Sequence, residues 1–220
     1  MERSLAHRIR TFLFSGFNPA VKLILIIHAV LFLINAIWRT GFGLAFEPHR
    51  FFQKPWTLFT YPLLNTSFVN MLLSGLWWWF MGSAMERFWG SKRFTAAWIA
   101  LVVASALGIW LGFLLSGNYQ AVLGGWYLPL AALTVAWSVT HQGQGVMLYG
   151  LVPVKSQWLA WISVAGVFLG YVGLNFFLAL CALIGCGTGY LLGLIWPGRT
   201  GCHFPRWRRK VTEIRLKRVK

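Results

Sequence analysis

Long apolar segments, separated by short polar or glycine-containing breaks, occupy most of the 220 residues. A helix that crosses a bilayer needs about 20 predominantly apolar residues. By this criterion the pattern predicts six spanning helices, at residues 21–38, 57–86, 94–116, 121–140, 157–173 and 175–196. The second exceeds what a bilayer requires, so we expect it to be tilted or partly outside the lipid.

Composition agrees with an all-α integral membrane protein. Hydrophobic residues make up 58% of the chain and charged residues only 11%, whereas the surface of a soluble domain needs about a quarter of its residues charged. The net charge of +16 would indicate nucleic acid in a soluble protein. Here the basic residues lie at the ends of the apolar segments, so we expect no nucleic-acid partner. Their distribution sets the orientation in the membrane instead.

The distribution of Lys and Arg predicts which ends of the spans share a side. Seventeen lie on the side that holds both termini, and three lie on the other side, in the loop at residues 39–56. The positive-inside rule therefore predicts cytoplasmic termini. The first apolar run lacks a small-residue cleavage site, so we expect it to be retained. Because the chain is compact and no targeting segment is evident, we expect a bacterial inner membrane.

Three regions follow from this pattern. Residues 1–20 form a basic amphipathic segment, residues 21–197 form the membrane domain, and residues 198–220 form a basic tail. The tail carries more charge than orientation requires, and it either lies near anionic lipid headgroups or docks to an acidic partner. Its candidate contact residues are Arg206, Arg208, Arg209, Lys210, Arg215, Lys217, Arg218 and Lys220.

The loop between the first two predicted spans is rich in aromatic residues, Gly and Pro. A loop this apolar is expected to lie against the membrane interface. The three cysteines show no metal-ligand spacing, and the isolated His28 and His141 carry no specific signal. We predict no metal and no cofactor.

The second span and its exit combine WWWF at residues 77–80 with Gly82, Glu86 and Gly90 at four-residue intervals. The last span carries Gly185, Gly189 and Gly193 at the same interval. Together these motifs resemble the second and last helices of the rhomboid family of intramembrane serine proteases. Glycines so spaced allow close approach of a neighbouring helix. The resemblance runs from about residue 56 to 196 and implies a six-helix rhomboid-like bundle with an interfacial loop between helices 1 and 2.

The catalytic groups of that family are missing at the matching positions. The resemblance places the family serine at Trp126 or Tyr127, and the family histidine at Ala182 or Cys186. The oxyanion positions fall on Asn70 and Ser74. A hydroxyl is a poor nucleophile until a base takes its proton, and His28 lies on a span without a serine. The chain is therefore expected to be a rhomboid pseudoprotease and not an enzyme.

A retained fold without catalytic groups predicts a binding function. We expect a cleft that accepts transmembrane helices of partner proteins, because polar side chains within lipid commonly face the interior of a bundle. Two alternatives stay open: a fixed subunit of a larger membrane complex, and an active protease with unrecognised residues. The expected cleft residues are Asn65, Asn70, Ser74, Trp126 and Tyr127.

Overall fold

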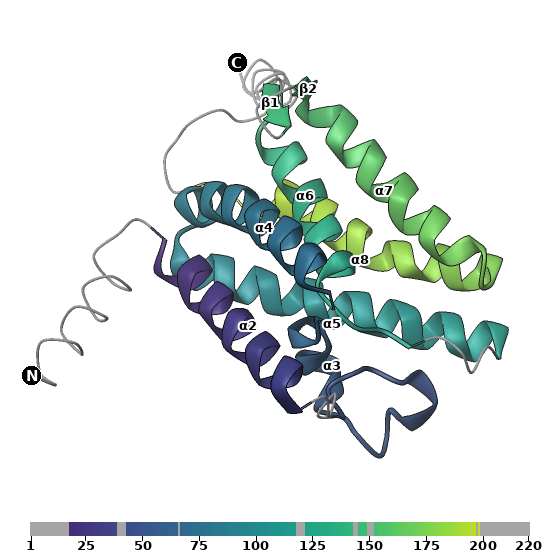
Figure 1. The fold of residues 1–220 in the computed structure, drawn as a ribbon. Helices are drawn as coiled ribbons and strands as arrows, with labels where there is room; N and C mark the ends of the chain where they lie inside the picture. The colour runs from purple at the N-terminus through teal and green to yellow at the C-terminus, as the bar shows by residue number, and fades with distance from the viewer. Residues whose placement is uncertain are drawn as a thin grey trace, which may run out of the picture.

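The computed structural model describes residues 18–38, 43–65, 67–117, 122–142, 145–148, 152–196 and 198. The amphipathic segment at residues 1–17 and the tail at residues 199–220, with its predicted lipid contacts, lie outside the described residues. Six long helices form the bundle, as predicted (Figure 1). They are α2 (Pro19–Trp38), α4 (Phe68–Trp89), α5 (Ser91–Ser116), α6 (Tyr127–Thr140), α7 (Ser156–Val172) and α8 (Phe176–Ile195).

The predicted second span is broken, and the single helix expected over residues 57–86 is wrong. A short helix α3 (Thr57–Thr60) leads into the 3₁₀ turn η3 (Tyr61–Leu63), and α4 begins at Phe68. Pro62 lies in the turn, where its missing N–H and the clash of its ring with the preceding turn oppose continuation of an α-helix. Ser67 then begins a new helix by accepting a hydrogen bond from the Asn70 N–H at 3.5 Å.

The fourth span begins six residues later than predicted. Residues 122–126 form an extended approach in which Leu123 pairs with Phe46 of the long loop, through hydrogen bonds of 2.8 and 2.9 Å. Gly125 has a φ of +81°, a conformation that other residues rarely adopt. Its N–H donates to the Tyr61 carbonyl at 2.9 Å, so this approach is held against η3.

A small hairpin joins α6 to α7 and was not predicted. Strands β1 (Gly145–Leu148) and β2 (Val152–Lys155) pair antiparallel, with Gly145 opposite Lys155 and Leu148 opposite Val152. The turn at residues 149–151 lies outside the described residues. Figure 1 shows the hairpin at one end of the bundle, next to the start of α7.

The glycine face of α8 packs against α5 and α6. A Cβ added at Gly185 would collide with Ser105, and one added at Gly189 would collide with the Ala132 carbonyl oxygen. At Gly193 an added Cβ would lie 3.0 Å from the Ala136 carbonyl oxygen. The spacing therefore serves close helix approach, as the sequence indicated.

Glu86 joins three parts of the fold at the corner after α4. Its carboxylate accepts hydrogen bonds from the backbone N–H groups of Ala20 at 3.0 Å and Val21 at 2.9 Å, and from the Ser91 hydroxyl at 2.7 Å. The first two are N–H groups at the start of α2, which have no partner within that helix. Gly82, one turn earlier, lets α2 approach, because an added Cβ would lie 3.0 Å from Val21. Gly90 ends α4 with a φ of +79°.

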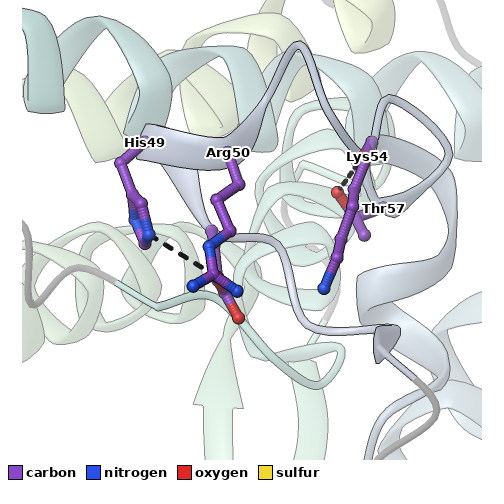
Figure 2. Close-up of polar contacts among 5 residues, drawn as sticks. His49, Arg50, Lys54 and Thr57 are labelled. Atoms are coloured by element: carbon purple, nitrogen blue, oxygen red, sulfur yellow. Dashed lines mark hydrogen bonds and ion pairs between the residues drawn. The ribbon is translucent and has the colours of Figure 1, made fainter.

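The loop after α2 folds back against α5 and does not extend away from the bundle. Phe46 is fully buried, and the Phe51 ring lies 5.2 Å from the Trp110 ring. The adjacent Phe52 is 85% exposed, which suits a segment at the lipid interface. In the 3₁₀ turn η2 (Pro48–Arg50), His49 and Arg50 lie side by side, both facing Glu47 at 3.7 and 3.4 Å (Figure 2).

Two of the described helices, α5 and α8, are long and apolar enough to cross a bilayer by length and composition alone. Helices α2, α6 and α7 contain shorter apolar stretches. The outer surfaces of these helices expose large apolar side chains such as Leu33, Leu169 and Ile195. A soluble protein rarely exposes so continuous an apolar surface, so lipid is the solvent that this bundle requires.

Candidate functional site

Trp126 fills the interior at the N-terminal end of α6, where the rhomboid resemblance places the family serine. Its side chain is 1% exposed. The indole stacks on the His28 imidazole of α2, with centroids 4.1 Å apart and planes 12° from parallel. An added Cβ at Gly75 of α4 would lie 4.0 Å from the same indole. The site is thus built from α2, α4 and the approach to α6.

Several buried polar atoms around this stack have no hydrogen-bond partner among the described residues. They are His28 Nε2, Trp126 Nε1 and both side-chain polar atoms of Asn65. His28 Nδ1 pairs with the Ile24 carbonyl at 2.8 Å. An unpaired polar group in such an interior is costly, so these atoms mark a functional candidate.

Tyr127, the alternative serine position, points toward α7. An added Cβ at Gly166 would lie 3.0 Å from the Tyr127 hydroxyl oxygen, and one at Gly170 would lie 4.0 Å from its ring. The side chain remains 51% exposed. Tyr127 therefore lies between α6 and α7 on an open side of the bundle, whereas Trp126 lies in the interior.

Asn70 and Ser74 form a pair on the surface of α4. The Ser74 hydroxyl donates to Asn70 Oδ1 at 3.3 Å, and Asn70 is exposed. Asn65, by contrast, is buried beside Gly125, where an added Cβ would lie 3.6 Å from Asn65 Oδ1. The structure thus divides the predicted cleft residues between an interior set and a lateral set.

The two positions expected for the family histidine lie on α8. Ala182 and Cys186 are buried, with 1% and 4% exposure, and neither carries an imidazole. Among the described residues the imidazoles are His28 in the bundle, His49 in the loop and His141 at the end of α6. Only the first reaches the predicted serine position.

Sequence reasoning missed the contact between His28 and Trp126. His28 is packed on Trp126 and hydrogen-bonded to the Ile24 carbonyl, so it lies against one of the two positions at which the resemblance places the family serine. The available signal was a polar side chain in the middle of an apolar span, which in lipid is a functional candidate by default. Spacing along the chain could not reveal it, because the two residues are 98 positions apart.

His28 supplies this arrangement with an imidazole, a side chain that can exchange a proton. General-base catalysis requires the base to lie within hydrogen-bond distance of the proton that it removes. No described hydroxyl or thiol is bonded to His28 Nε2. No group of three or more metal-binding side chains occurs among the described residues either.

Comparison of the whole chain with known proteins identifies its family. The family described as "Eukaryotic integral membrane protein (DUF1751)" matches residues 22–197. The chain is also similar to the rhomboid protease GlpG of Salmonella paratyphi A, Salmonella choleraesuis and Salmonella newport. Each is 28% identical over 130 residues, covering 54% of this chain and 44% of the relative. The chain therefore spans less than half the length of these curated relatives.

The family description corrects one expectation. A bacterial inner membrane was predicted, and the matching family is eukaryotic, so that prediction is wrong. Compactness and the lack of a recognisable targeting segment do not distinguish a bacterial membrane from a eukaryotic one. The matched region begins three residues into α2, covers the other five long helices completely, and includes Glu86 and the glycine face of α8. This chain belongs to the DUF1751 family of eukaryotic integral membrane proteins and has a rhomboid-like six-helix fold.

Proposed function

We propose that this rhomboid-like protein does not cleave peptide bonds and instead binds transmembrane helices of partner proteins. The observation that carries the proposal is the buried stack of Trp126 on His28, and Trp126 is one of the two positions at which the rhomboid resemblance places the family nucleophile. An indole cannot attack a carbonyl carbon under these conditions, because it has no basic lone pair or acidic hydroxyl to activate. Its bulk also occupies the space that a scissile bond would require.

The neighbouring hydroxyl does not replace the missing serine. Tyr127 directs its oxygen toward Gly166 of α7, whereas the imidazole of His28 stacks on Trp126 in the interior. A base and a nucleophile must share a proton to form a catalytic pair. The polar groups that remain are suited to hydrogen bonding and not to acyl transfer.

The lateral surface of α4, α6 and α7 supports helix binding. Helix α6 contacts both α4 and α7 and lies between them (Figure 1). Asn70 is exposed on α4 next to Ser74, and Tyr127 on α6 is half exposed. Polar side chains commonly form hydrogen bonds between helices in membranes. A partner helix could therefore satisfy groups that lipid tails leave unpaired.

A site-specific photo-crosslinker tests the proposed surface. We would place p-benzoylphenylalanine at Tyr127 or Asn70, with Leu111 on α5 as a control position that is also exposed. The proposal predicts crosslinks to transmembrane segments of other proteins from the first two positions and not from Leu111. Equal crosslinking from all three positions would remove the assignment to this surface.

Proteolysis is tested separately with the purified protein and transmembrane substrates. We expect no cleavage and no labelling by a fluorophosphonate serine-hydrolase probe. If cleavage occurs and His28→Ala abolishes it while crosslinking is retained, the protein is an enzyme and the non-catalytic proposal fails.

A fixed-subunit role is the second candidate. Trp79 on α4 is partly exposed and provides a large amphipathic contact surface. Crosslinked partners discriminate the two roles: one partner in constant stoichiometry favours a subunit, and several partners in variable amounts favour a helix-binding protein.

A further inference from the structure

A second recess lies between α6, α7 and α8, and none of its lining residues belongs to the stack of Trp126 on His28. It is a groove of about 410 Å³, within the usual size range of small-molecule sites. Helices α7 and α8 each contribute four residues at positions i, i+3, i+4 and i+7, and α6 with the turn that follows it contributes four at the same spacing, so one face of each helix lines the groove. These residues are Val135, Ser138, Val139 and Gln142; Gln157, Ala160, Trp161 and Val164; and Leu183, Cys186, Gly187 and Tyr190.

The groove has one polar end and one apolar end. Gln142 and Gln157 lie at the end of α6 and the start of α7, at the tail side of the bundle, where α8 also ends. Val164 and Leu183 lie deeper, near the middle of their helices. Trp161 and Tyr190 line the groove and are 70% and 50% exposed, as amphipathic aromatic residues near a membrane interface commonly are.

The length of the groove distinguishes between possible occupants. From Gln157 to Val164 it follows seven residues of α7, which is about 10 Å at 1.5 Å per residue. A transmembrane helix would run through the whole hydrocarbon layer of about 30 Å, and the groove ends well before that. A lipid acyl chain occupies only one leaflet, about 15 Å, half of that layer. The groove therefore matches one leaflet.

Charge at the polar end favours an anionic headgroup. The exposed Lys155 comes two residues before Gln157, and Arg87, Lys92 and Arg93 are exposed at the α4–α5 corner on the same side. Among the described residues on that side, the acidic side chain is Glu86, which is buried and bonded to α2. A basic surface of this kind attracts anionic lipid.

From these observations we propose that the groove between α6, α7 and α8 binds an anionic phospholipid. Its acyl chains lie along Val139, Val164 and Leu183, and its headgroup lies near Gln142, Gln157 and Lys155. The amide groups of the two glutamines donate hydrogen bonds to phosphate or ester oxygens, and Lys155 supplies the positive charge.

Gly187 provides a direct test, because it lines the groove and an added Cβ there meets nothing within 4 Å. Gly187→Leu should therefore direct a side chain into the groove, with a Cβ that meets no protein atom. Gly173→Leu is the matched control, since Gly173 also has open space around an added Cβ but lies at the α7–α8 corner, outside the groove.

The protein is reconstituted in phosphatidylcholine nanodiscs that contain phosphatidylserine with a photoreactive group on one acyl chain. We expect crosslinks at groove residues of α7 and α8, lost in Gly187→Leu and retained in Gly173→Leu. A Lys155→Gln variant should weaken the preference for phosphatidylserine over photoreactive phosphatidylcholine by about fivefold, the usual effect of one basic residue beside an anionic surface.

Crosslinks spread evenly over the outer faces of α7 and α8, and unchanged in Gly187→Leu, would show bulk lipid only and overturn the proposal. Equal capture of phosphatidylserine and phosphatidylcholine by the unmodified chain would overturn the anionic assignment. Thermal unfolding of each variant in detergent establishes that a lost crosslink does not reflect a lost fold. Lys155→Gln provides a second variant that should leave the fold intact, because Lys155 is exposed.

Discussion

Among the described residues, Glu86 is the carboxylate that connects different helices of the bundle. It is 1% exposed and accepts two backbone hydrogen bonds from the start of α2 and one from Ser91. An anionic group at a helix N-terminus is stabilised by the unpaired N–H groups and by the helix dipole. Glu86 therefore fixes where the first span meets the second.

We expect Glu86→Ala to lower the free energy of unfolding by at least about 2–3 kcal/mol, because hydrogen bonds to charged groups contribute about 1.5–3 kcal/mol each and the orphaned donors are buried. Glu86→Gln keeps a carbonyl oxygen and should lose less. Unfolding in mixed detergent micelles, followed by tryptophan fluorescence, measures both variants. Equal losses for the two substitutions would contradict the hydrogen-bond explanation.

Trp126 and Tyr127 are adjacent in the sequence but have different environments. Trp126 is buried against His28, and Tyr127 reaches α7. The sequence limited the family serine position to these two residues and excluded serine at both. It did not indicate that Trp126 would be buried while Tyr127 remained half exposed. That difference depends on how α2, α4 and α7 surround the start of α6.

At the scale of elements, α8 determines the close packing of the bundle. Its glycine face contacts α5 and α6 so closely that no side chain fits at Gly185 or Gly189. In lipid, helices associate chiefly through such van der Waals packing, since the surrounding tails are as apolar as the helices.

Gly189→Ala should lower stability by about 1–3 kcal/mol, the usual cost of overpacking, because the added methyl collides with the Ala132 carbonyl oxygen. Gly187→Ala, two residues earlier on the same helix, should be neutral or slightly stabilising, since its Cβ meets open space and alanine favours the helix over glycine. Thermal unfolding in detergent compares the two variants. A comparable loss in both would mean that packing is not the cause.

The broken second span shows how an element depends on its neighbours. The apolar run from residue 57 onward is continuous enough to predict one helix, yet Pro62 and the N-cap Ser67 divide it. The resulting η3 turn receives the N–H of Gly125 and holds the approach to α6. The hydrophobic pattern alone predicted one helix that was too long. It contains no information on where the chain must turn to accommodate another segment.

At the scale of the whole molecule, the six helices alternate in direction and gather the positive charge at one end. Arg87, Lys92 and Lys155 lie at the end of the bundle where α4 and α8 end and α7 begins. Arg50 and Lys54 lie on the loop after α2 (Figure 2). Six spans place the start of α2 and the end of α8 on the same side of the membrane.

Labelling of single cysteines in sealed vesicles tests this topology. With the native cysteines replaced, Lys92→Cys and Lys155→Cys should react with a membrane-impermeant maleimide from the same side, and Lys54→Cys from the opposite side. Detergent-permeabilised vesicles serve as the accessibility control. Reaction of Lys54→Cys and Lys92→Cys from one side would contradict the six-span arrangement.

The sequence by itself determined the membrane class, the number of long helices, the glycine face of α8 and the absence of serine and histidine at the expected catalytic positions. These properties are carried by hydrophobic run length and by residue identity, which are local. The tertiary structure decided the break before α4, the hairpin before α7, the contact of His28 with Trp126 and the groove at Gly187. Each of these depends on segments distant in sequence meeting in space, and neither periodicity nor composition encodes which segments meet.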